Sequence, residues 1–87
     1  MFYVYVLYSK QKGEQYIGYT NDLRRRLTEH LSGKSVYTRH GGTWELVYYE
    51  AYRSKTDALQ RERKLKGFKK GYAMLKIRIQ DSLRSVA

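Results

Sequence analysis

The sequence predicts a single α+β domain, and three features of its 87 residues support that prediction. Residues 2–8 read FYVYVLY and residues 15–19 read QYIGY, two runs rich in β-branched and aromatic residues that flank a polar turn containing Gly13. Residues 44–52 form a third run of this kind. The other segments carry apolar residues at helical spacing. We therefore expect an N-terminal hairpin, a third strand and three helices.

The first strand pattern is apolar at both odd and even positions, which is typical of a central strand covered on both faces. Suppose that the first and second strands pair antiparallel so that the residue numbers of each facing pair add to an odd sum. Tyr5 and Tyr16 then share one face of the sheet, and their hydroxyls could converge within about 5–8 Å. Gly18 would lie on that face too, where a glycine inside a strand often marks the close approach of a backbone or a ligand. Tyrosine is also a good strand residue, and the chain has ten.

Three helices are expected in the rest of the chain. The first runs from a cap at residues 21–22 to Gly33, and leucines recur along it every four residues. A basic loop follows at residues 32–43. The second helix runs from a cap at residues 54–57 to Gly67. The third is marked by apolar residues spaced 4, 3 and 4 apart, namely Phe68, Tyr72, Leu75 and Ile79.

Composition narrows the classes of partner. Lys and Arg total 18 against 8 Asp and Glu, and a formal net charge of +10 on so small a body attracts polyanions, with nucleic acid the leading candidate. Membrane-surface binding is not expected, because no segment sets bulky apolar residues opposite a face of lysines. The chain has no cysteine, which excludes disulfides and zinc–thiolate sites, and no apolar run approaches the roughly 20 residues of a membrane span.

We expect one domain over residues 1–82, followed by a short tail at residues 83–87. The first strand pattern starts at residue 2 with no signal or transit segment ahead of it, so a cytoplasmic location is expected. The oligomeric state is left open.

Two polar residues flank the apolar stripe of the first helix. Arg26 and His30 are one turn apart, and Arg26 is placed where its guanidinium could reach a phosphate held against the sheet. Arg24 and Arg25 are expected to be solvated charges or phosphate contacts. The plain alternatives are a surface arginine at position 26 and a helix-flank histidine with a local hydrogen bond at position 30.

Glu62 is the most informative single residue of the second helix, because its helical neighbours place its carboxylate on the apolar stripe. A carboxylate in such a place is usually paired or binds a metal ion. One reading is an ion pair with a nearby base. The other is a divalent cation, since Mg²⁺ is often held by one carboxylate together with waters and substrate phosphate oxygens. The candidate bases are Arg61, Arg63, Lys64 and Lys66.

These residues together resemble the GIY-YIG nuclease superfamily over nearly the whole chain. The likeness is greatest to its small stand-alone members, which are similar in turn to the amino-terminal nuclease domain of the bacterial excision-repair protein UvrC. The resemblance rests on the order and spacing of Tyr3-Val4-Tyr5, Tyr16-Ile17-Gly18, Thr20, Leu23, Arg26, Leu27, His30, Ala58, Arg61-Glu62 and Leu65-Lys66.

The resemblance implies a three-stranded antiparallel sheet with flanking helices, and hydrolysis of nucleic-acid phosphodiester bonds with one Mg²⁺ or Mn²⁺ ion. DNA is favoured over RNA as the substrate. By the same likeness Tyr5 and Tyr16 are the motif tyrosines, Arg26 is the catalytic arginine and Glu62 the metal ligand, while His30 matches a position that is frequently histidine and supports the site. We expect these side chains to line one shallow cleft. Gly18, Arg24, Arg25, Arg39, Lys66, Lys69 and Lys70 are the expected contacts with nucleic acid.

The chain departs from the family pattern at two places. Tyr3 replaces the first glycine of the first motif, and an asparagine that many members carry near the end of the domain is missing, with Gln80 or Ser82 as the substitutes at hand. Tyr16 is the expected proton acceptor and Tyr5 the residue that orients water, although the reverse assignment stays open. The alternative function is a non-catalytic, basic nucleic-acid-binding module that keeps the nuclease fold.

Overall fold

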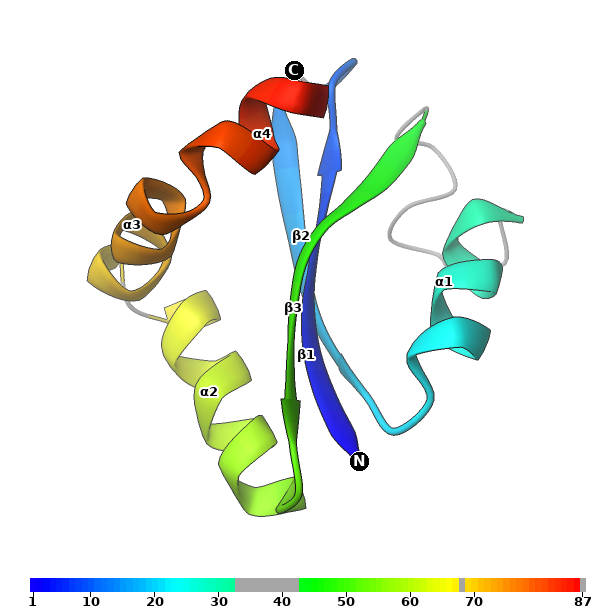
Figure 1. The fold of residues 1–87 in the computed structure, drawn as a ribbon, viewed down its shortest axis with the longest axis vertical. Helices are drawn as coiled ribbons and strands as arrows, with labels where there is room; N and C mark the ends of the chain where they lie inside the picture. The colour runs from blue at the N-terminus through cyan, green and yellow to red at the C-terminus, as the bar shows by residue number, and fades with distance from the viewer. Residues whose placement is uncertain (33–42, 68, 87) are drawn as a thin grey trace.

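The computed structural model describes residues 1–32, 43–67 and 69–86, and its elements follow the order β1, β2, α1, β3, α2, α3, α4 (Figure 1). Of the residues singled out above, Arg39, Phe68 and the side chain of Lys69 lie outside this description. The strands are β1 (Phe2–Ser9), β2 (Glu14–Thr20) and β3 (Trp44–Tyr52), and the helices are α1 (Leu23–Leu31), α2 (Lys55–Gly67), α3 (Lys69–Arg78) and α4 (Gln80–Val86).

The three strands form one antiparallel sheet in the order β2-β1-β3, which confirms the predicted sheet. The hairpin turn contains Gly13, whose φ of 63° lies in the left-handed region that favours glycine. In the hairpin register Tyr5 lies opposite Gly18, and Leu7 lies opposite Tyr16. Tyr5 and Tyr16 are therefore diagonal neighbours on one face, as their numbering predicted.

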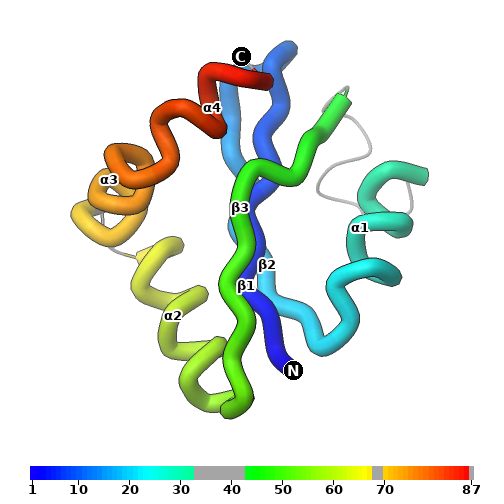
Figure 2. The backbone as a smooth tube through the Cα atoms, viewed as in Figure 1, coloured from blue at the N-terminus to red at the C-terminus, as the bar shows by residue number. Residues whose placement is uncertain are grey.

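Helices cover both faces of the sheet, so that β1 is buried on both sides. Figures 1 and 2 show α1 on one side, and α2, α3 and α4 on the other. The core beneath α2 to α4 includes Val4, Val6 and Ile17 from the sheet, and the core beneath α1 includes Tyr5 and Leu7. The alternation of these residues along β1 confirms the prediction of a central strand covered on both faces.

Local signals set the helix starts where the sequence predicts them. Asp22 caps α1 by accepting a hydrogen bond from the backbone N–H of Arg25 at 3.1 Å, and Ser54 caps α2 by accepting one from Asp57 at 3.3 Å. Gly71 permits a close crossing of α3 over α2, because a Cβ atom there would lie 2.5 Å from the backbone oxygen of Lys64.

The structure has four helices in the described residues, where the sequence predicted three. The predicted third helix corresponds to α3, and α4 is an additional helix that begins at Gln80 and includes residues 83–86, which were expected as a tail. Leu83 explains the difference, because it packs against the buried core one turn beyond Ile79 and extends the apolar stripe. Among the described residues, no helix combines the length and the apolar character needed to cross a membrane.

Candidate active site

Tyr5 lies at the centre of the site and is fully buried on the α1 face of the sheet. Its hydroxyl oxygen lies 2.9 Å from Nε2 of His30. Its ring packs directly over Gly18, since a Cβ atom at position 18 would lie 2.5 Å from Tyr5 Cζ and closer still to the hydroxyl oxygen. The close approach that the strand glycine predicted is thus made by a side chain of the protein itself, and Gly18 is buried beneath it.

His30 projects from the last turn of α1 and is 4% exposed. Its ring meets those of Tyr5 and Tyr16 edge-on, with centroid distances of 5.7 Å and 5.1 Å. Burial lowers the pKa of His30 to about 4, and the positive charge of Arg26 acts in the same direction, partly offset by Glu29. The imidazole is therefore neutral at pH 7.

Arg26 lies on α1, one turn before His30, and its charge acts on Tyr5. Its Nη1 lies 3.0 Å from Oε1 of Glu29, one helical turn away, and its side chain is 27% exposed. Burial opposes its charge, but hydrogen bonds with Glu29, Tyr5 and Tyr16 outweigh burial and raise the pKa of Arg26. The guanidinium thus stays charged beside both hydroxyls. The sequence reading missed Glu29, which its i, i+3 spacing from Arg26 could have indicated.

The protonation of Tyr5 follows from the same contacts. Burial raises the pKa of Tyr5 to about 12, Arg26 acts to lower it, and Tyr16 adds to the rise. Tyr5 therefore stays protonated at neutral pH. Tyr16 belongs to the edge strand β2, is half-buried, and has its ring centroid 6.2 Å from that of Tyr5.

Glu62 reaches the site through an ion pair. Its Oε2 lies 3.2 Å from Nζ of Lys66, and the Glu62 side chain is 21% exposed. The same ammonium lies 6.0 Å from the centroid of the Tyr16 ring. The helix α2 packs against β1 and β2 on the face opposite α1, so Glu62 and the two tyrosines come from opposite faces of the sheet. Of the ion pairs considered from the sequence, the structure contains the one with Lys66, and the contact of this lysine with Tyr16 links the two faces.

Arg61, next to Glu62 in sequence, has a separate structural partner. Its Nε donates to both carboxylate oxygens of Glu50, at 3.0 Å and 3.1 Å. Glu50 also accepts hydrogen bonds from the hydroxyls of Tyr48 and Tyr52. Burial alone would raise the pKa of Glu50, but the bond from Arg61 and those from the tyrosines lower it. This network fixes α2 against β3 and thereby helps to position Glu62.

The donor set limits what metal the site could hold. Within the described ranges no group of three or more His, Cys, Asp and Glu side chains could hold a metal ion. Glu62 remains as a single carboxylate that already attracts a cation. One carboxylate suits Mg²⁺ or Mn²⁺, which keep several waters and take phosphate oxygens as further ligands.

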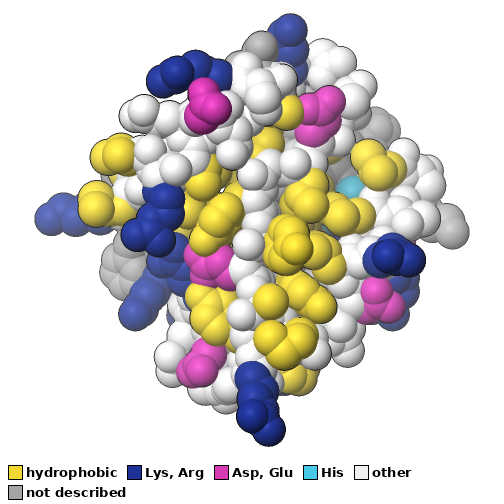
Figure 3. Space-filling model, viewed as in Figure 1, with side chains coloured by type: hydrophobic (Ala, Val, Ile, Leu, Met, Phe, Trp, Pro, Cys, Tyr) yellow, Lys and Arg dark blue, Asp and Glu magenta, His cyan; other side chains and the backbone are white. Residues whose placement is uncertain are grey.

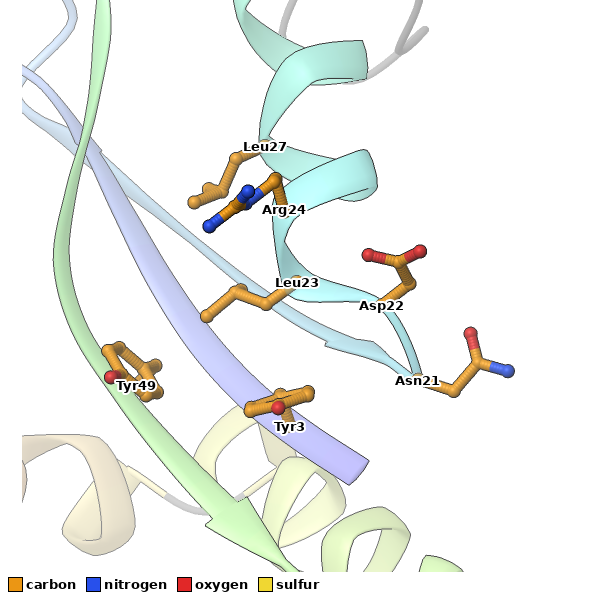
Figure 4. A pocket seen from close by; sticks show the side chains of 7 residues that line it. All are labelled: Tyr3, Asn21, Asp22, Leu23, Arg24, Leu27 and Tyr49. Atoms are coloured by element: carbon orange, nitrogen blue, oxygen red, sulfur yellow. The ribbon is translucent and has the colours of Figure 1, made fainter. Parts of the chain in front are cut away.

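The other predicted nucleic-acid contacts are spread over the surface. Arg24 and Arg25 are exposed on α1, and Arg24 lines an open pocket of about 450 Å³ with Leu27, Tyr3 and Tyr49 (Figure 4). Lys70 lies on α3, across the sheet from α1. Figure 3 shows hydrophobic side chains at the centre of one face, with Lys and Arg around its border. Arg24 and Arg25 are therefore separated from Lys70 by the sheet.

Comparisons with known proteins agree with this fold. The family model described as the GIY-YIG catalytic domain matches residues 1–73. UPF0213 proteins of Bacillus pumilus and of Streptococcus pneumoniae serotype 4 are each 46% identical to the chain over 65 residues, which are 74% of this chain and 65% of the relative. The chain thus matches just under two thirds of the length of these relatives. The solution NMR structure of the UPF0213 protein BH0048 from Bacillus halodurans has a TM-score of 0.57 and 37% identity, and the match covers 91% of this chain and 87% of that one.

Proposed function

This chain belongs to the GIY-YIG family, which is a family of nucleases, and we propose that it is an endonuclease that hydrolyses phosphodiester bonds in DNA with one Mg²⁺ or Mn²⁺ ion. The observation that carries the proposal is the cluster of Tyr5, Tyr16 and His30 on one face of the sheet, with Arg26 one turn before His30 on the same helix. A basic binding domain has no need of two tyrosines packed on a buried histidine beside an arginine, whereas a nuclease needs a fixed positive charge where a phosphate reacts.

Tyr16 is the proton acceptor in this proposal, and Tyr5 is a positioning residue. Tyr5 is fully buried, its hydroxyl lies 2.9 Å from His30 Nε2, and its raised pKa of about 12 keeps its proton in place. Tyr16 is half-buried at the sheet edge, and Nζ of Lys66 lies 6.0 Å from its ring centroid. Water reaches this partly exposed side chain more readily than the fully buried Tyr5, so Tyr16 is the better placed to take a proton from an attacking water.

Arg26 and Glu62 supply the remaining roles. Arg26 stabilises the charge that builds on the phosphoryl oxygens during in-line attack. Glu62 would hold the divalent ion, which supplies positive charge for a phosphate oxygen and the leaving 3′ oxygen when bound. His30, neutral at pH 7, keeps Tyr5 oriented without adding a charge to the site.

The net charge of +10 gives nucleic acid a long-range attraction to the protein. Arg24, Arg25, Lys66 and Lys70 contact phosphates in this proposal, together with Arg39 and Lys69. Such contacts release counterions, so affinity should fall steeply as salt is raised, whatever the sequence of the nucleic acid.

A binding module without turnover is the second candidate, and one observation favours it. Both charged groups required for catalysis have partners inside the protein, since Arg26 pairs with Glu29 and Glu62 pairs with Lys66. A phosphate or a metal ion must displace these partners before the groups can act. If phosphate and metal never displaced these partners, the protein would still bind nucleic acid through its exposed Lys and Arg side chains.

A nicking assay separates the two functions. Single-stranded, duplex and branched DNA and RNA are incubated with the protein in Mg²⁺ or Mn²⁺, beside Glu62→Gln and the control Glu14→Gln, whose carboxylate is exposed at the start of β2. We expect the protein and the control to cut, and Glu62→Gln to bind without cutting. Binding without cutting by the unmodified protein would establish the binding module, and undiminished cutting by Glu62→Gln would place the metal ligand elsewhere.

A further inference from the structure

Lys66 forms an ion pair with Glu62 that the proposed chemistry does not explain. Its Nζ lies 3.2 Å from Oε2 of Glu62 and 6.0 Å from the Tyr16 ring centroid, in the last turn of α2. It thus places a fixed positive charge beside the carboxylate proposed to hold a divalent cation. An ammonium and a divalent ion repel each other at such short range and compete for the same oxygen.

Two other basic side chains close to the site form ion pairs with carboxylates other than Glu62. Arg26 lies 3.0 Å from Glu29, and Arg61 lies 3.0 Å from Glu50. Among the described residues, Lys66 is the base that pairs with Glu62. The charge of Glu62 in the free protein is therefore balanced by this lysine.

The ion pair between Lys66 and Glu62 can be displaced easily. The Lys66 side chain is 51% exposed, and an exposed pair of this kind is weak and readily screened. Its flexible four-carbon stem lets the ammonium move by several ångströms without a change in the backbone. A phosphate that enters beside Tyr16 offers anionic oxygens of the same kind as those of Glu62.

We propose that Lys66 is a displaceable internal cation that couples nucleic-acid binding to metal binding at Glu62. In the free protein Lys66 neutralises Glu62 and weakens its hold on a divalent ion. When a phosphate binds, Lys66 transfers to it and leaves the carboxylate open. By linkage, nucleic acid tightens metal binding, and metal tightens nucleic-acid binding by the same factor. This inference rests on the proposed function, because it takes Glu62 as the metal ligand.

Binding of Mn²⁺, followed by electron paramagnetic resonance of the free ion, tests the coupling without any turnover. The comparison uses the unmodified protein, Lys66→Met, Lys64→Met and Glu62→Gln. Lys64 is exposed on the same helix, so its replacement removes the same charge without touching the Glu62 pair. Each protein is titrated alone, with a phosphorothioate oligonucleotide, and with a methylphosphonate oligonucleotide. Both oligonucleotides resist cleavage, but the second lacks backbone charge.

We expect Lys66→Met to bind Mn²⁺ about threefold to tenfold more tightly than the unmodified protein in the absence of nucleic acid. Lys64→Met should change the affinity by less than about twofold, because salt screens a charge further away. The phosphorothioate should tighten Mn²⁺ binding to the unmodified protein by a larger factor than to Lys66→Met, in which the ion gains only the oligonucleotide's own ligand atoms. The methylphosphonate should affect neither. Glu62→Gln supplies the baseline for Mn²⁺ held by the oligonucleotide.

Two results would overturn the proposal in different ways. If the Lys66→Met and Lys64→Met proteins bind Mn²⁺ alike, or if the phosphorothioate tightens both equally, the coupling is refuted and the metal site stands. If the unmodified protein binds Mn²⁺ no better than Glu62→Gln, the metal ligand of the proposed function is wrong and the coupling is refuted with it.

Discussion

Replacing Gly18 with alanine tests the packing on which the site depends. The added Cβ would lie 2.5 Å from Tyr5 Cζ and 2.9 Å from Cε1, distances that unstrained structures do not allow. Tyr5 is fully buried and bonded to His30, so its ring has no free space in which to retreat. Overpacking of this kind costs about 1–3 kcal/mol. For a domain of this size, that cost lowers the melting temperature by roughly 5–20 °C.

Thermal unfolding followed by circular dichroism measures the effect, with Gly67→Ala as the control. Gly67 is also in a regular element, but a Cβ atom there meets nothing within 4 Å. The control should be neutral or slightly stabilising, because alanine favours helix over glycine. In a Tyr5→Leu background the clashing ring atoms are gone, so Gly18→Ala should cost little more. A Gly18→Ala protein that melts with the control would refute the close packing of Tyr5 on Gly18.

Three further changes address the chemistry. The pKa of His30 is lowered in the folded state to about 4, so protonation of this residue favours the unfolded chain. The stability that neutral His30 contributes is therefore complete above pH 6.5 and is lost as the pH falls towards 4. Between pH 7 and pH 4, urea titration should show the unmodified protein losing about 3 kcal/mol more than His30→Gln, and an equal loss in both would contradict the neutral imidazole. Arg26→Ala should reduce the rate of cleavage by about 10²- to 10³-fold in single-turnover assays. The control Arg53→Ala removes an exposed arginine that has no role in the proposal, and it should leave the rate unchanged. Equal rates in the two variants would remove Arg26 from the reaction. Replacing Arg24 and Lys70 together should weaken binding to all nucleic-acid sequences alike. The slope of log affinity against log salt concentration should fall by about one unit per lost contact. An unchanged slope would exclude these two residues as phosphate contacts.

Patterns local in the sequence predicted the elements and their faces. The parity of Tyr5 and Tyr16 in an antiparallel hairpin is enough to place both on one face, and cap residues such as Asp22 locate helix starts within a turn. These signals succeed because they depend on strand and helix geometry alone. The fourth helix was missed because Leu83 gains its apolar partners only when the chain has already folded back on β3.

The ion pair within α2 could have been predicted, because among the four basic residues considered Lys66 lies one helical turn after Glu62, at i+4. Contacts between elements lay beyond sequence reasoning. Arg61, next to Glu62 in the family motif, pairs instead with Glu50, eleven residues away on β3. Gly18 is expected from the sequence to contact a ligand, whereas in the structure the Tyr5 side chain fills the space above it. Predicting this contact requires the rotamer of a buried side chain, which the sequence pattern does not give.

The charges of the site carry a consequence for the order of events on the protein. Each ionised group has an internal counterion, with Arg26 beside Glu29 and Glu62 beside Lys66, while His30 is neutral and Tyr5 keeps its proton. A site so balanced has little net attraction for a lone phosphate or a lone metal ion. The net charge of +10 brings the polyanion to the protein at long range. In the proposed mechanism a phosphate attracts Arg26 and Lys66 away from their carboxylates, and a divalent ion takes Glu62, so each ligand would lower the cost of binding the other.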